Sequence, residues 1–241
     1  MEFVNLFTKE FVSVFEKLQM RAYLSEVRKA ANRNKIKAFL WQGEGDLVFD
    51  EAFACIQSSE GWLDRDEALL LYLLAKHEGF DAVEIGSYCG KSTIAIAAGL
   101  REGLTLHAID PHSGDRSQVE SGLKVDTWLA FLGNLRRAGV DSKVNPIRSF
   151  SASAAGDFSC SPIGMMFIDG WHDTDAVLED FLFWRPFLNT QFCTIIFDDF
   201  AYPPVLRGIM ALRHHLPPVY GAIGKDLVFR GELPVRKSAW C

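Results

Sequence analysis

Apolar residues recur with two different periods along this chain, and the change of period separates its beginning from the rest. Within the first 40 residues, they recur at the spacing of one helix face: Phe3, Phe7, Phe11, Val14 and Leu18. A loop signal follows at residues 42–46, and a second helical pattern extends from about Asp64 to His77. The beginning of the chain is therefore predicted to be helical.

From residue 80 onward, short apolar runs alternate with helical patterns. The runs predict seven strands, at residues 82–85, 104–109, 143–148, 165–168, 193–197, 220–223 and 226–229. Helices are predicted from Lys91, around residues 128–135 and at 174–187, whereas the polar residues 112–126 predict a loop. Strands that alternate with helices are typical of an α/β fold, here a mainly parallel seven-stranded sheet with helices on both faces.

Length and charge narrow the choice of architecture and partner. The 241 residues are enough for one α/β domain with a buried core, so we expect a helical extension at residues 1–60 and one domain at 61–241. The net charge of -6 argues against a nucleic-acid binder. Basic residues gather between Arg21 and Lys37. They form either a solvated helix face or a wall over an anionic substrate.

The cysteines and the N-terminus indicate a cytoplasmic protein. None of the five cysteines forms a C-x-x-C pair, so neither a zinc site nor a redox motif is predicted. Free thiols fit a reducing compartment. The charged residues among the first twenty leave no signal-peptide core, and no apolar stretch is long enough for a membrane span.

A glycine turn after the first predicted strand is the clearest chemical signal. Gly86 and Gly90 enclose three residues, a spacing that matches neither the G-x-G-x-x-G dinucleotide fingerprint nor a P-loop. Gly86 would allow a tight turn, and Gly90 would allow the backbone to approach a ligand. Asp110 ends the second strand, 26 positions after Glu84, where an acidic side chain can bind ribose hydroxyls. Turn and acid together predict a nucleotide-type cofactor.

Carboxylates end two further strands. Asp169 follows the fourth predicted strand, and Asp198 and Asp199 follow the fifth. Carboxylates that converge at the carboxyl edge of a sheet repel one another unless their pKa values rise or a cation joins them. Oxygen ligands of this kind suit Mg²⁺. In the alternative interpretation, Asp198 or Asp199 merely caps a helix.

The segment Glu84–Ser92 resembles the cofactor-binding turn of class I S-adenosylmethionine (SAM) dependent methyltransferases, and especially that of catechol O-methyltransferases. The resemblance implies a Rossmann-like fold and SAM as cofactor. It implies that the methionine part of SAM is held around Glu84, Gly86, Ser87, Tyr88, Gly90 and Ser92. It also implies that Asp110 binds the ribose and Ser151 faces the adenine, with Asp169 and Trp171 lining the pocket.

The spacing of the later acids resembles that of the same family. It is similar to the metal-binding acids of catechol O-methyltransferases and of metal-dependent sugar O-methyltransferases, which implies a metal at Asp169, Asp198 and Asp199. His172 stands where the catechol enzymes carry a lysine, so it is the predicted general base, acting beside Asp169. The sugar enzymes use an acid where this chain has Trp171. Asp173 is the reserve candidate, and a surface role for His172 stays open.

The sequence thus predicts a SAM-dependent methyltransferase, with Mg²⁺-dependent O-methylation of a small hydroxylated molecule, either a sugar, a phenol or a natural product. Two alternatives stay open: a metal-independent enzyme with His172 as base, and a SAM-binding protein without catalysis. No nucleic-acid or membrane partner is predicted, and the N-terminal helices leave a homodimer contact open.

Overall fold

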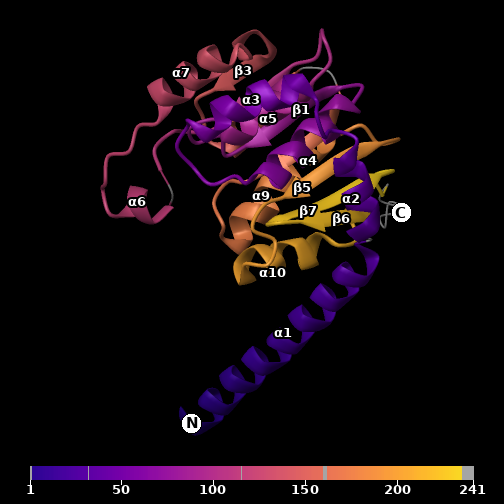
Figure 1. The fold of residues 1–241 in the computed structure, drawn as a ribbon. Coiled ribbons are helices and arrows are strands. Elements are labelled where there is room, and N and C mark those ends of the chain that lie inside the picture. Colours follow the sequence, from indigo (N-terminus) through magenta and orange to yellow (C-terminus); the bar gives the residue numbers. More distant parts are fainter. Residues whose placement is uncertain (1, 32, 115, 160–161, 235–241) are drawn as a thin grey trace.

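A seven-stranded sheet forms the centre of the molecule (Figure 1). The structure is a computed structural model, and it describes residues 2–31, 33–114, 116–159 and 162–234. The strands are β1 (Asp81–Ile85), β2 (Leu106–Ile109), β3 (Val144–Ile147), β4 (Ile163–Ile168), β5 (Cys193–Phe197), β6 (Val219–Ile223) and β7 (Asp226–Gly231). They lie in the order β3-β2-β1-β4-β5-β7-β6.

Strand direction confirms the predicted sheet. β1 pairs in parallel with β2 and β4, and the outer neighbours β3 and β5 continue the parallel arrangement. Only β7 is antiparallel to its neighbours β5 and β6. The reversal arises because β6 and β7 form a hairpin, in which Gly224 and Lys225 alone connect the two strands.

The helices are α1 (Glu2–Ala30), α2 (Arg33–Trp41), α3 (Leu47–Gln57), α4 (Arg65–Lys76), α5 (Lys91–Gly99), α6 (Arg116–Glu120), α7 (Trp128–Ala138), α8 (Ser151–Asp157), α9 (Thr174–Trp184) and α10 (Pro203–Leu212). The short helix α6 lies within residues 112–126, which the sequence had predicted to be a loop. The helix predicted at 174–187 ends at Trp184 and continues as the 3-10 turn Arg185–Phe187, because Pro186 cannot donate a helical hydrogen bond.

Alternate residues of each strand enter two separate cores, one on each face of the sheet. On one face, Ala82 of β1 packs in a cluster with α2, α3, α4, α5 and α7. On the other face, Val83 packs in a cluster with the end of α1 and with α8, α9 and α10. Both faces are thus covered by helices, as predicted, and this explains why the parallel strands are apolar throughout.

The N-terminal helices differ in how they meet the domain. Ile36 of α2 and Phe49 and Ile56 of α3 are buried in the same core as α4 and α5. By contrast, α1 extends away from the remainder of the molecule (Figure 1), and Val27 near its end is buried against the opposite face. The side chains of the predicted apolar stripe Phe3, Phe7 and Phe11 lie outside the described residues.

The described cysteines Cys55, Cys89 and Cys193 are free thiols. Cys160 and Cys241 lie outside the described part of the chain. Within that part, no helix combines the length and the apolar composition that crossing a bilayer requires.

A buried carboxylate supports the turn that follows β1. Glu84 is fully buried (0% exposed), and its Oε2 accepts hydrogen bonds from Ser87 Oγ at 3.0 Å and from Thr93 Oγ1 at 2.5 Å. One residue donates from the turn and the other from α5, so the carboxylate ties these two elements to β1. Burial raises the pKa of Glu84 to about 7, against the opposing effect of these hydroxyl donors.

This raised pKa predicts how stability depends on pH. Because the pKa of Glu84 is higher in the folded than in the unfolded state, its contribution is complete below about pH 4.5 and is lost as pH rises through about 7. The loss amounts to about 3 kcal/mol. Glu84→Gln should remove this component, so that the free energy of unfolding falls less steeply between pH 5 and 8 than in the wild type. Urea unfolding at several pH values measures it, with exposed Glu102→Gln as control. Parallel profiles for Glu84→Gln and wild type would contradict the assignment.

Candidate active site

The predicted functional residues meet at the carboxyl edge of the sheet, where β1 and β4 lie side by side. Strand order reverses at this point, because β2 and β3 continue to one side of β1 and β5 continues beyond β4. Open α/β sheets bind ligands in the crevice at such a position. Backbone hydrogen bonds fix the strand ends, since Asp169 N donates to Ile85 O at 2.8 Å and Asp198 N donates to Ile168 O at 3.0 Å.

Gly86 allows the two strand ends to approach closely. A Cβ atom at this position would lie 2.0 Å from the carbonyl oxygen of Asp169, and the φ of Gly86 is +91°. No other residue type fits without moving the backbone. The glycine turn therefore directly adjoins the first of the predicted metal-binding acids.

The second glycine packs closely against a neighbouring helix. Gly90 begins α5 with a φ of +91°, and a Cβ atom there would meet the Phe131 ring at 3.1 Å. Gly90 thus permits the left-handed conformation and close packing with α7. Ser87 and Ser92 are buried, and both form hydrogen bonds with Glu84 below the turn. Their side chains therefore support the turn from beneath.

Asp110 fixes the turn from the side. Its Oδ2 accepts hydrogen bonds from the backbone N–H groups of Ser87 at 3.0 Å and Tyr88 at 2.8 Å. Its Oδ1 accepts from His112 N at 2.6 Å. Each carboxylate oxygen can accept more than one hydrogen bond, so the partly exposed Asp110 keeps acceptor capacity for hydroxyl groups of a ligand.

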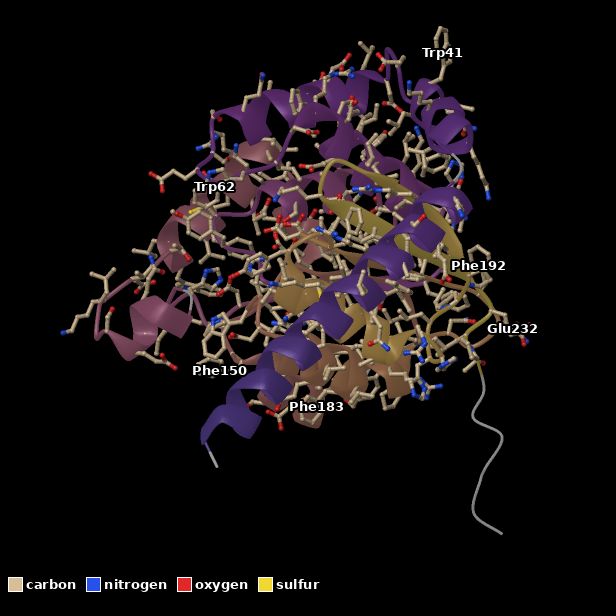
Figure 2. All side chains as sticks on the ribbon, turned by 90° about the horizontal axis from the view of Figure 1, so that it is seen from below. Trp41, Trp62, Phe150, Phe183, Phe192 and Glu232 are labelled. Atoms are coloured by element: carbon tan, nitrogen blue, oxygen red, sulfur yellow. The ribbon has the colours of Figure 1, made fainter. Side chains whose placement is uncertain are left out.

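Two aromatic pairs flank the turn. Trp62, which is 84% exposed, stacks on Tyr88 with ring centroids 6.3 Å apart. Phe150 contacts Trp171 edge to face at 5.8 Å, and Trp171 Nε1 donates to Gly114 O. Figure 2 shows Trp62 and Phe150 on the same side of the molecule, away from Phe192. The sequence interpretation missed Trp62 and Phe150, because isolated aromatic residues in loops carry no pattern.

Ser151, the predicted adenine neighbour, is the first residue of α8. Its Oγ accepts a hydrogen bond from Trp184 Nε1 at 3.1 Å, and it also bonds the buried carboxyl group of Asp180. These contacts join α8 to α9 behind the end of β3. The hydroxyl group of Ser151 is thus engaged within the protein, next to the exposed ring of Phe150.

The acidic residues predicted to bind a metal converge, and His172 lies among them. His172 Nε2 is 3.6 Å from Asp169 Oδ1 and 3.3 Å from Asp199 Oδ2. Ligand atoms of Asp169, His172 and Asp198 lie within 4.8 Å of one another. The ring of Tyr202 closes the far side of His172, with centroids 6.4 Å apart. We refer to Asp169, His172, Asp198 and Asp199 as the acidic centre. The reserve base Asp173 is the N-cap residue of α9, directly after His172.

A lysine that the sequence interpretation missed also reaches the acidic centre. Lys225 Nζ is 2.9 Å from Asp198 Oδ2 and 3.7 Å from Asp199 Oδ1. It comes from the β6–β7 hairpin, far along the chain from these acids. Lys225 lies between the predicted strands 220–223 and 226–229, but only the strand order brings this connection next to the end of β5.

The acidic centre fits a divalent cation. Burial, followed by the adjacent Asp198 carboxylate, raises the pKa of Asp169 well above its ordinary value, and a bound cation would oppose both effects. The buried His172 Nε2 has no hydrogen-bond partner among the described residues. Carboxylate oxygens suit Mg²⁺, and an added imidazole nitrogen suits transition metals such as Mn²⁺ equally.

Comparison with known proteins agrees with this geometry. A family model described as a methyltransferase domain matches residues 83–200. Among solved structures is the O-methyltransferase TomG from Streptomyces achromogenes, which is involved in tomaymycin synthesis and was solved in complex with SAM. Its sequence is 18% identical, the match covers 83% of this chain and 96% of the TomG chain, and the TM-score is 0.56. An O-methyltransferase from Bacillus cereus in complex with SAH is 16% identical, with 80% and 95% covered and a TM-score of 0.56.

A proposed O-methyltransferase from Klebsiella pneumoniae is 18% identical, with 78% of this chain and 91% of that chain covered and a TM-score of 0.58. At such identities, the similarity of structure shows the fold alone. The family match in addition identifies residues 83–200 as a methyltransferase domain. That match includes the glycine turn, Asp110 and the acidic centre, on a sheet of the topology described above. Residues 83–200 are therefore identified as a methyltransferase domain, and the chain has the fold of the class I SAM-dependent methyltransferases.

Proposed function

We propose that this chain transfers the methyl group of SAM to a hydroxyl oxygen of a small molecule, with a divalent cation at the acidic centre. One observation carries the proposal: Gly86 of the cofactor turn and Asp169 of the acidic centre lie in backbone contact. A methyl donor on the turn and an acceptor oxygen at the acids would thus be neighbours. TomG and the Bacillus cereus protein, which share the fold, are both described as O-methyltransferases.

Residues of this chain would hold SAM from three sides. The turn around Tyr88 and the N-terminus of α5 would face its methionine part, whose support comes from Glu84, Ser87 and Ser92 beneath. Asp110 would bind the ribose hydroxyls through its remaining acceptor capacity. The edge-to-face pair Phe150 and Trp171 would line the adenine side.

The acidic centre would prepare the acceptor. Asp169 and Asp198 would hold the cation, with Asp199 beside them, and a bound cation lowers the pKa of a coordinated hydroxyl group. His172 would accept the hydroxyl proton, because its Nε2 lies among the carboxylates that orient the ring. Removal of water and alignment of the two substrates complete what methyl transfer requires of a protein.

A second candidate is methyl transfer without a metal. One observation favours it, since the ammonium group of Lys225 already lies within hydrogen-bond distance of Asp198. Transfer of radiolabelled methyl groups from SAM to a panel of phenols, sugars and catechols, with EDTA or with Mg²⁺ or Mn²⁺, separates the two. Turnover that requires the ion supports the first candidate, and equal turnover in EDTA supports the second. If no acceptor is methylated although SAM binds, the proposed catalysis is wrong.

Asp110→Ala should weaken SAM binding by about 1–3 kcal/mol, because charge-assisted hydrogen bonds to the ribose are lost. Calorimetric titration with SAM measures the affinity. Since Asp110 also holds the turn, Asp110→Asn and thermal unfolding of each variant separate lost contacts from lost folding. Exposed Asp141→Ala is the control. Wild-type affinity in a folded Asp110→Ala protein would refute the ribose assignment.

Asp198→Asn should keep SAM binding but lose metal-dependent turnover, because an amide removes one anionic ligand from the centre. SAM affinity by calorimetry and methyl transfer in a metal titration measure the two properties separately. Asp175→Asn, an exposed residue of α9, is the matched control. Unchanged turnover in Asp198→Asn would show that the acids have only a structural role.

His172→Gln should lower the rate of methyl transfer by about 10²–10⁴ while SAM affinity is kept, as expected for loss of a general base. Single-turnover kinetics at saturating SAM measure the chemical step. Exposed His214→Gln serves as control. A loss of less than tenfold would indicate that Asp173 or water, rather than His172, accepts the hydroxyl proton.

A further inference from the structure

The β6–β7 hairpin holds Lys225 in a defined place. Its backbone N–H donates to Glu67 Oε1 at 2.7 Å, and its carbonyl oxygen accepts from Phe200 N at 3.1 Å. The preceding Gly224 has a φ of +52°, and a Cβ atom there would lie 2.1 Å from Glu67 Oε1. The turn therefore requires glycine, and it fixes the next residue against β5.

Glu67 is itself anchored. It belongs to the capping box of α4, in which Asp64 Oδ1 accepts from Glu67 N at 2.8 Å and Glu67 Oε2 accepts from Asp64 N at 3.2 Å. Glu67 is buried, so this contact between α4 and the hairpin is shielded from solvent. The position of Lys225 is thus built from two elements of the fold, unlike that of an ordinary surface lysine.

The side chain of Lys225 points into the acidic centre. Its Nζ contacts Asp198, whose side chain is only 7% exposed, and approaches Asp199. The side chain of Lys225 is 38% exposed, so it has room to turn toward solvent. Although burial lowers the pKa of Lys225, the hydrogen bond and the charge of Asp198 outweigh this effect and raise it. The ammonium group is a permanent cation at this place.

Negative charge nevertheless remains in excess around Lys225. The adjacent Asp226 is 1% exposed, and its Oδ2 has no hydrogen-bond partner among the described residues. Burial, together with the charges of Asp198, Glu67 and Asp169, raises the pKa of Asp226 well above its ordinary value. A raised pKa favours the uncharged form of Asp226, so the excess does not depend on this residue. Lys225 itself contacts two carboxyl groups, those of Asp198 and Asp199, with one ammonium group.

We propose that Lys225 is a built-in counter-cation that competes with the divalent metal for Asp198 and Asp199, so that the metal binds weakly and exchanges readily. This inference rests on the proposed function, which gives the acidic centre a metal. In the metal-free protein the ammonium group compensates the acids. In the metal-bound protein it either repels the ion from a few ångströms away or turns toward solvent, and both outcomes lower the affinity for the metal.

The size of the effect follows from electrostatics. A single and a double positive charge a few ångströms apart repel each other enough, even at the dielectric constant of water, to weaken binding about tenfold. Lys225→Met keeps most of the aliphatic chain but removes the charge. It should therefore bind divalent metal at least about tenfold more tightly than the wild type. Lys225→Arg keeps the charge and should stay within about threefold of the wild-type affinity.

Mn²⁺ is the probe, because free Mn²⁺ can be counted by electron paramagnetic resonance while calorimetry gives the dissociation constant. Wild type, Lys225→Met, Lys225→Gln and Lys225→Arg are titrated as full-length proteins. The control is Lys124→Met, an exposed residue between α6 and α7, away from β6 and β7 (Figure 1), which changes the net charge equally. Thermal unfolding with and without Mn²⁺ is a second readout. Lys225→Met should have a lower Tm without the ion and a larger gain in Tm with it.

Tighter Mn²⁺ binding in Lys225→Met and Lys225→Gln, but not in Lys124→Met, would support the proposal. Unchanged or weaker binding in both Lys225 variants, with measurable binding in the wild type, would overturn it and leave the proposed function intact. If neither the wild type nor a folded Lys225 variant binds Mn²⁺, the metal part of the proposed function and this inference both fail. SAM binding, measured in parallel, shows whether the methyltransferase assignment survives.

Discussion

The turn after β1 depends on one buried carboxylate. Glu84 is buried at the end of β1 and accepts hydrogen bonds from one hydroxyl group of the turn and one of α5. Strand, turn and helix are thereby joined into one unit. Gly86 then permits a backbone contact with the end of β4, which no side chain would allow. Because of these two features, the glycine turn and the acidic centre are fixed relative to each other. Alignment of two reacting groups is the main contribution that a methyltransferase makes to its reaction.

Charge balance governs the acidic centre. Asp169 and Asp198 lie at the ends of neighbouring parallel strands, so their carboxyl groups are brought together by the sheet itself. The hairpin beyond β5 then adds Lys225, and the loop between β4 and α9 adds His172. The antiparallel end of the sheet thus has a functional consequence, since it brings a cation to a centre built by parallel strands. In our proposal, competition between this cation and a metal ion separates the two candidate mechanisms.

The sequence was sufficient to predict the strands and the turn, because apolar runs and the Gly86–Gly90 spacing are local signals. The match between strand ends and acids also allowed the convergence of Asp169 and Asp198 to be expected. Lys225 could not be found in this way. Its relation to Asp198 depends on strand order, and no local pattern encodes the insertion of β7 between β5 and β6. The packing of Gly90 against the Phe131 ring could not be predicted either, because it depends on where α7 lies relative to α5.

The most direct test is a calorimetric titration of the wild-type protein with SAM, performed once with EDTA and once with a divalent metal ion and a catechol or sugar acceptor. We predict saturable SAM binding in both conditions, because the turn and Asp110 are formed without a metal. An additional heat that requires the ion is predicted when the acceptor is present. Absence of SAM binding in either condition would contradict the central claim that the crevice between β1 and β4 binds this cofactor.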